Sequence, residues 1–195
     1  GRGEAFLQAQ PAANRGYGNA VTTSRDVTDR AYACQVLLSL CETVGMRLRR
    51  DGQAGSCITI QLRTSDFETW SHQTRLASAT NVTGELYQAA CALLDQAWDR
   101  KTPLRQLGVS VTQLGDGTLR QYSLFDAADY ARQEKLDTAV DALREKFGEG
   151  ALFRAALLHS DERMAGGLHK KRRTGITKPI EDEAARIRKK YGNND

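Results

Sequence analysis

Two hydrophobic periodicities alternate along the first 115 residues, and their order constrains the fold more than any other feature of the chain. Apolar residues at helical spacing predict one helix ending near Arg50 and another over residues 83–98. Their stripes are Val36, Leu37, Leu40, Val44 and Leu48 in the first, and Leu86, Ala90, Leu93, Leu94 and Ala97 in the second. Residues 57–63 and 105–114 instead alternate apolar and polar side chains, which predicts strands that are buried on one face.

Two more extended segments complete the order. Residues 17–23 favour a strand because of Val21, Thr22 and Thr23. Residues 69–76 follow Ser65-Asp66 and predict the second strand of a hairpin. The chain therefore predicts an α+β domain of the ferredoxin-like split β-α-β-β-α-β type, with both helices on one sheet face. Trp70 and His72 are expected on the helix-covered face.

Polar residues next to the predicted helices indicate where the helices begin and end. Asp26 or Thr28 is expected to cap the first helix and Thr83 the second. Gly52 and Gly55 are expected to end the first helix.

Composition divides the chain into five segments. Residues 1–16 predict an irregular lead-in, 17–114 the sheet domain, and 115–128 a linker. In residues 129–158 we expect a helix followed by a short apolar strand at Ala151–Leu158, with the helix directing Leu136, Val140, Leu143 and Phe147 inward. Residues 159–195 predict a basic flexible tail.

Bulk properties indicate a globular protein outside the membrane. The chain is 40% hydrophobic and 27% charged, and its net charge of +4 allows a polyanionic partner without demanding one. No apolar run approaches the ~20 residues of a membrane span, and no signal peptide is visible. Cys34, Cys41, Cys57 and Cys91 lack metal-ligand spacing, so we expect reduced, mostly buried thiols in a cytoplasmic monomer without a cofactor of its own.

A compact peptide motif lies just beyond the predicted sheet, at Gln121-Tyr122-Ser123-Leu124-Phe125. Its glutamine can donate and accept hydrogen bonds, and Leu124 with Phe125 can fill one apolar pocket. The motif resembles the peptide with which bacterial replication and repair proteins bind the β sliding clamp. The alternative is a short strand whose Leu and Phe pack back onto the domain.

Several further segments together resemble the C-terminal region of Y-family translesion DNA polymerases of the UmuC/DinB type. These segments are Tyr17–Thr23 with Arg25-Asp26, Ile58–Phe67, Leu104–Val111, Glu134–Asp137, Arg144–Gly148 and Arg154-Ala155. The resemblance implies that residues 1–16 end a thumb domain and its linker, and that residues 17–114 are a little finger domain that grips primer-template DNA.

The resemblance also implies that catalysis resides elsewhere. The family's palm domain holds the carboxylates that bind Mg²⁺ for nucleotidyl transfer, and no palm is recognisable here. Ser160-Asp161-Glu162 fits a surface turn better than a palm site. The chain alone is therefore expected to be inactive, and Gly1 at its start is consistent with a fragment of a longer enzyme.

The uncovered sheet face is predicted to carry Thr, Ser, Gln and Arg with few carboxylates. Such a face is either merely solvated or suited to phosphate oxygens. From this face and from the resemblance we predict DNA contacts at Asn19, Thr22, Arg63, Thr64, Ser71, Arg75, Arg105 and Ser110. Two other functions remain open: an RNA-binding ferredoxin-like module, and a non-catalytic protein-interaction domain with a solvated sheet.

Overall fold

The predicted order of elements is confirmed by the structure, a computed structural model that describes residues 15–116, 127–148 and 151–157. The first range contains β1 (Gly16–Val27), α1 (Arg30–Arg50), β2 (Ala54–Thr64), β3 (Thr69–Thr80), α2 (Thr83–Ala97) and β4 (Leu104–Gly115). Each strand extends beyond its predicted range by between one and a few residues.

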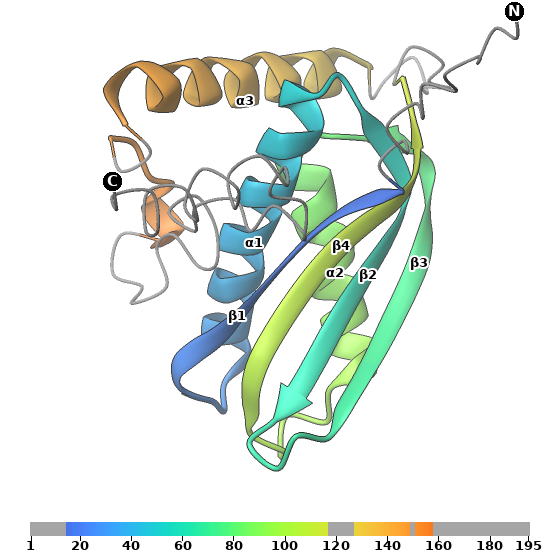
Figure 1. Cartoon of the computed structure of the whole chain (residues 1–195), viewed down its shortest axis with the longest axis vertical. Helices are drawn as coiled ribbons and strands as arrows, with labels where there is room; N and C mark the ends of the chain where they lie inside the picture. Colours follow the sequence, from blue (N-terminus) through green and yellow to red (C-terminus); the bar gives the residue numbers. More distant parts are fainter. Residues whose placement is uncertain (1–14, 117–126, 149–150, 158–195) are drawn as a thin grey trace, which may run out of the picture.

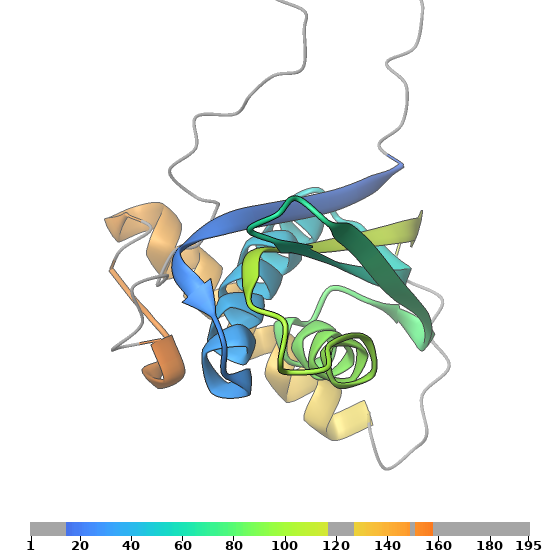
Figure 2. The same cartoon turned by 90° about the horizontal axis from the view of Figure 1, so that it is seen from below.

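The four strands form one antiparallel sheet in the order β1-β4-β2-β3. Strand β4 lies between β1 and β2, and β2 lies between β3 and β4. Each β-α-β unit is therefore split by one strand, as predicted. Helices α1 and α2 cover one face of the sheet, and its other face is not covered by either helix (Figures 1 and 2).

Alternating strand residues and the two helical stripes form the core, as their patterns predicted. Ile58, Ile60 and Leu62 of β2 are fully buried, and Leu107, Val109 and Val111 of β4 are nearly so. Burying one such side chain contributes roughly 2 kcal/mol. Trp70 packs against this core and donates a hydrogen bond from Nε1 to the carbonyl of Ala97 at 3.1 Å. His72 lies opposite Ile60 and so on the same side, although its side chain is exposed.

Both predicted helix caps are wrong, because the carboxylates of two other residues accept the backbone hydrogen bonds at the N-termini of α1 and α2. Asp29 caps α1 by accepting a hydrogen bond from the backbone nitrogen of Tyr32 at 2.8 Å. Helix α2 begins at Thr83 without a local side-chain cap. The amide of Thr83 instead donates to Asp137 of a third helix at 2.8 Å, which places a negative charge at the positive end of the α2 dipole.

The predicted stop of α1 is correct at one glycine. Gly52 follows the helix with a φ of +63°, a conformation that glycine adopts without steric cost. Gly55 instead lies inside β2, where an added Cβ would collide with Val111.

The third helix, α3 (Ala127–Phe147), lies across the end of the helical layer where α1 ends and α2 begins (Figure 1). Its buried residues are Tyr130, Asp137 and Arg144, which recur every seven positions and share one face. Arg49 of α1 binds Asp137 at 3.2 Å and Asp141 at 2.7 Å, and Arg144 binds Glu42 of α1 at 3.1 Å. Charged side chains, not an apolar stripe, attach α3 to the domain.

The predicted inward face of α3 is therefore wrong. Leu136, Leu143 and Phe147 are 56%, 43% and 64% exposed, and Val140 is only half-buried. The charged face turns inward because α1 presents Glu42 and Arg49, whose buried charges require partners.

The predicted strand at Ala151–Leu158 is also wrong in the part of it that the structure describes. Residues 151–154 are irregular, and a single 3₁₀ turn, η1 (Ala155–Leu157), follows them. The carbonyl of Leu152 accepts hydrogen bonds from the guanidinium of Arg144 at 2.9 and 3.0 Å. Arg154 extends the ionic network by binding Glu42 at 2.8 Å and Asp137 at 2.6 Å.

Three predicted features lie outside the described residues: the lead-in before residue 15, the Gln121–Phe125 motif, and the basic tail with Ser160–Glu162. Among the helices in the described ranges, none is both long enough and apolar enough to cross a membrane.

Candidate nucleic-acid interface

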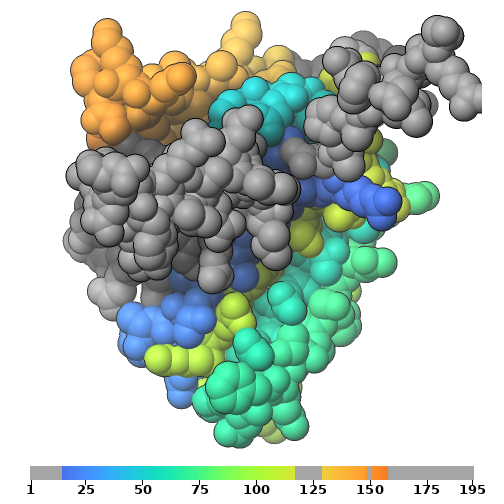
Figure 3. Space-filling view, in the orientation of Figure 1, coloured from blue at the N-terminus to red at the C-terminus, as the bar shows by residue number. Residues whose placement is uncertain are grey.

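The strand register defines the composition of the uncovered sheet face. Residues that lie opposite each other in an antiparallel pair point to the same side. The face consists of small, hydroxyl, amide and guanidinium side chains and one thiol: Gly16, Gly18, Ala20 and Thr22 of β1, Gln106, Gly108, Ser110 and Thr112 of β4, Cys57, Thr59, Gln61 and Arg63 of β2, and Thr69, Ser71, Gln73 and Arg75 of β3. None of these described residues is a carboxylate. We call this set the open face; parts of it are visible in blue, yellow-green and green in Figure 3.

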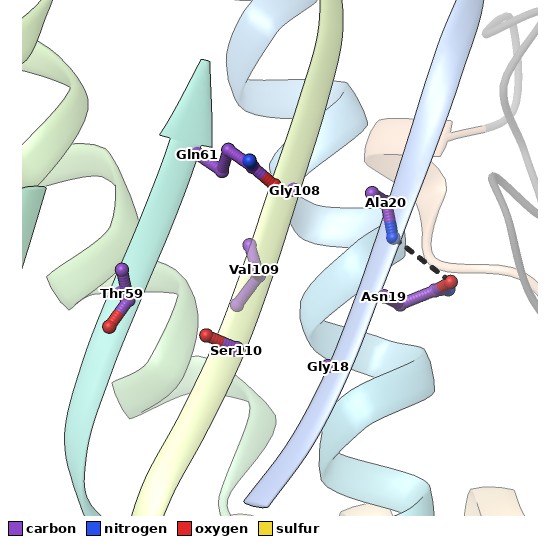
Figure 4. Close-up of a pocket in the computed structure, with 8 residues that line it drawn as sticks. All are labelled: Gly18, Asn19, Ala20, Thr59, Gln61, Gly108, Val109 and Ser110. Atoms are coloured by element: carbon purple, nitrogen blue, oxygen red, sulfur yellow. Dashed lines mark hydrogen bonds between the residues drawn. The ribbon is translucent and has the colours of Figure 1, made fainter. Parts of the chain in front are cut away.

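A shallow hollow of about 370 Å³ lies across β1, β4 and β2 on this face (Figure 4). Gly18, Ala20 and Gly108 form its floor, and Thr59, Gln61 and Ser110 surround it. A Cβ added to Gly108 would lie 3.2 Å from the Cβ of Ala20, so only glycine leaves this spacing relaxed. Small residues let another molecule's backbone approach the strands closely, while the hydroxyl and amide groups supply hydrogen bonds.

Two arginines make the open face cationic, one near each end of β2. Arg63 belongs to β2, and Arg75 belongs to β3, where it lies opposite Cys57 of β2. Six residues of β2 therefore separate the two positions along the strand, or about 20 Å at the usual rise per strand residue. No carboxylate of the described residues forms an ion pair with either arginine. Arg63 donates from Nη1 to Gln106 at 3.3 Å, but its buried Nε has no hydrogen-bond partner among the described residues.

Five of the eight predicted DNA-contact residues lie together on the open face: Thr22, Arg63, Ser71, Arg75 and Ser110. Their role in DNA binding stays a prediction.

The other three predicted residues lie elsewhere. Asn19 is opposite Val109, whose side chain is in the core, and its Oδ1 accepts from the Ala20 nitrogen at 3.1 Å (Figure 4). Thr64 is buried opposite Leu104. Arg105 lies at the register irregularity of β4 and pairs with Asp26 at 3.5 Å.

Phe67 is a candidate contact residue that the sequence reasoning did not single out. It stands in the β2–β3 turn with a φ of +67°, and its side chain is 73% exposed. The guanidinium of Arg63 lies over its ring, 4.9 Å from the centroid. An exposed aromatic stacked on an arginine resembles the platforms on which nucleic-acid bases stack. The signal in the sequence was an aromatic residue in an otherwise polar turn, Ser65–Glu68.

The described residues contain no group of three or more His, Cys, Asp or Glu side chains arranged to hold a metal ion. The hydroxyl, amide and guanidinium side chains of the open face offer hydrogen bonding and positive charge.

Comparison with known proteins identifies the family. The model of the impB/mucB/samB family C-terminal domain matches residues 14–124, which include every residue of the open face. The chain belongs to this family. The resemblance to the UmuC/DinB C-terminal region is thereby confirmed.

Individual relatives agree with the impB/mucB/samB assignment. DNA polymerase IV of Clostridium acetobutylicum is 36% identical over 145 residues, which cover 74% of this chain and 36% of that protein. DNA polymerase IV 2 of Bacillus subtilis is 36% identical over 146 residues, covering 72% of this chain and 34% of that protein. The chain thus spans about a third of the length of these relatives.

A solved structure is also similar: a complex of the β-clamp processivity factor and the little finger domain of PolIV. The similar chain in that complex is 18% identical, with a TM-score of 0.44 over 56% of this chain and 97% of that one. The family assignment rests on the sequence matches alone.

Proposed function

We propose that this chain is the DNA-gripping and clamp-tethering C-terminal part of a Y-family translesion DNA polymerase. The observation that supports DNA binding is a carboxylate-free sheet face carrying Arg63 and Arg75, in a chain of the impB/mucB/samB family. Nucleotidyl transfer, with its Mg²⁺ ions, belongs to a palm domain outside this chain. The chain's contribution is to hold the primer-template and to keep the enzyme at the replication site.

The open face suits a sugar-phosphate backbone better than it suits bases. Hydroxyl and amide groups on all four strands can donate hydrogen bonds to phosphate oxygens, and the arginines add charge. The hollow at Gly18, Ala20 and Gly108 lets the backbone approach the sheet. Contacts of this kind carry little sequence information, which matches a protein that must slide along any template.

The RNA-binding alternative requires stacking aromatics on the central strands. On the open face, the central strands β4 and β2 present Gln106, Gly108, Ser110 and Thr112, and Cys57, Thr59, Gln61 and Arg63. None is aromatic, so the described surface favours DNA backbone contacts over RNA base recognition.

The clamp tether rests on Gln121–Phe125, whose sequence resembles the clamp-binding peptide. Its place in the chain suits a tether, because it follows the last strand of the sheet and does not interrupt the open face.

Replacing the two arginines tests the DNA-binding half of the proposal. The double variant Arg63→Gln/Arg75→Gln should bind primer-template DNA at least 10-fold more weakly at low salt. The slope of log K against log salt should become about 2 units shallower, because each phosphate contact releases roughly one counterion. Fluorescence anisotropy between 50 and 200 mM salt measures both quantities.

Arg50→Gln is the matched control, since Arg50 ends α1 on the helical layer and its side chain is 65% exposed. The proposal fails if this control loses as much affinity as the double variant, or if binding of the unaltered protein is insensitive to salt. Preference for single-stranded RNA would support the RNA-binding alternative. Absence of any nucleic-acid binding at low salt would support the interaction domain.

A further inference from the structure

Two thiols from different helices lie in contact beneath the sheet. The Sγ atoms of Cys34 in α1 and Cys91 in α2 are 3.3 Å apart, although 57 positions separate the residues in the sequence. The Cys91 thiol donates its proton toward the Cys34 sulfur. A disulfide requires the sulfurs to approach to about 2.05 Å, so only a small movement separates this contact from a bond.

The surroundings of the pair favour a reactive thiolate at Cys34. The hydrogen bond from Cys91 lowers the pKa of Cys34 to about 7, although burial opposes the shift, and the guanidinium of Arg30, one helical turn earlier, lowers it further. The same hydrogen bond raises the pKa of Cys91. Cys91 is only half-buried and gives a small oxidant a route to the pair, while Cys34 is 6% exposed.

The other two cysteines differ from this pair. Cys41 lies on α1 with Cys34, but its side chain is completely buried, which raises its pKa. Cys57 belongs to the open face of the sheet. Within the described residues, the sulfur–sulfur hydrogen bond joins Cys34 and Cys91.

We propose that Cys34 and Cys91 form a redox-active dithiol that closes to an intramolecular disulfide when the protein meets a small peroxide. The Cys34 thiolate, which has lost its proton to solvent, attacks one peroxide oxygen and the O–O bond breaks. Cys34 becomes a sulfenic acid, and the leaving hydroxide takes a proton back from solvent and departs as water. The Cys91 sulfur then attacks the Cys34 sulfur, the S–O bond breaks, and a second water leaves. Two thiols and one hydrogen peroxide thus give one disulfide and two waters.

The disulfide would join α1 to α2 while leaving the open face unchanged. It would close a loop of more than fifty residues, which restricts the unfolded chain and so stabilises the fold. The Tm of the oxidised protein should exceed that of the reduced protein by roughly 10 °C. DNA affinity should stay the same, so this inference and the proposed function are tested separately.

The experiment treats the whole chain with stoichiometric hydrogen peroxide, blocks the remaining thiols by alkylation, and measures the intact mass without reduction. We expect a monomer that has lost two hydrogens and kept two alkylated thiols. Trypsin should release residues 31–47 joined to residues 76–100, a linkage that reduction separates. Cys41→Ala resolves which cysteine of residues 31–47 is bonded, and this variant should keep the cross-link.

Cys34→Ala and Cys91→Ala should each abolish the cross-link and the rise in Tm. Because Cys91 is only half-buried, Cys91→Ala should keep the fold, so it tests the cross-link even if the Cys34 variant fails to fold. The inference is overturned if peroxide yields only singly oxidised thiols or intermolecular dimers, or if the cross-link survives in the Cys91 variant.

Discussion

At the scale of single residues, replacing Phe67, whose ring packs against the Arg63 guanidinium, tests whether bases stack on the β2–β3 turn. Base–aromatic stacking contributes about 1–3 kcal/mol per base. Phe67→Ala should therefore weaken binding to a primer-template with a single-stranded overhang by roughly 5- to 150-fold, while circular dichroism stays unchanged because the ring is 73% exposed. Equilibrium titration of a labelled overhang measures the effect.

Phe147→Ala is the control, since this ring is 64% exposed but lies on α3, away from the open face. Equal affinity of the Phe67 variant and the unaltered protein would show that the turn does not contact bases.

Individual residues also show which of the DNA-contact positions could be placed on the open face from the sequence. Alternation along β2 and β4 placed Arg63 and Ser110 correctly, because a strand's side-chain period is fixed. Thr64 directly follows Arg63, so the same alternation places it on the opposite, core side of β2, where the structure has it. Asn19 and Thr22 are three positions apart, so one face of a regular strand cannot hold both. Asn19 was predicted from family resemblance, not from periodicity.

At the scale of elements, α3 shows how a hydrophobic stripe can mislead. Leu136, Val140, Leu143 and Phe147 have ideal helical spacing, yet the helix turns Asp137 and Arg144 inward. The signal lay in α1, where Glu42 and Arg49 are seven residues apart, as Asp137 and Arg144 are in α3. Arg49 pairs with Asp137 and Glu42 with Arg144, so the two charge pairs match in antiparallel order. Periodicity within one helix cannot show such a match between two helices.

Arg144→Met tests whether this ionic network holds α3. The change leaves Glu42, 5% exposed, without its most deeply buried partner, and the half-exposed Arg154 alone cannot replace it. Losing one member of a buried ion pair costs about 3–5 kcal/mol. The free energy of unfolding, from urea titration, should fall by about 3 kcal/mol.

Lys146→Met in the same last turn is the control, because its side chain is exposed. A loss below about 1 kcal/mol for Arg144→Met, typical of a surface ion pair, would contradict the role of the network.

At the scale of the whole molecule, the clamp tether should act independently of the fold. Leu124→Ala/Phe125→Ala should abolish binding to the β sliding clamp, because apolar anchors carry most of the energy of such peptides. Surface plasmon resonance on immobilised clamp measures the affinity, and circular dichroism should show an unchanged fold.

Leu143→Ala/Phe147→Ala removes another exposed Leu and Phe, on α3, and should bind the clamp normally. Unchanged affinity in the Leu124/Phe125 variant would refute the anchor assignment.

The sequence predicted the two-layer sheet and helix arrangement because each element's hydrophobic period agreed with its place in the fold. It did not predict the attachment of α3, which depends on charges from distant segments.

That attachment has a mechanical consequence. Residues 117–126 join β4, which ends at Gly115, to α3, which begins at Ala127, and both elements belong to the same folded body. A ring bound to this stretch would be connected to the folded domain through two chain segments of a few residues each, not through one trailing end. Two short connections would confine the domain to a small volume beside such a ring and so raise its effective concentration there. They would also restrict the angles at which the domain and the bound ring can lie relative to each other.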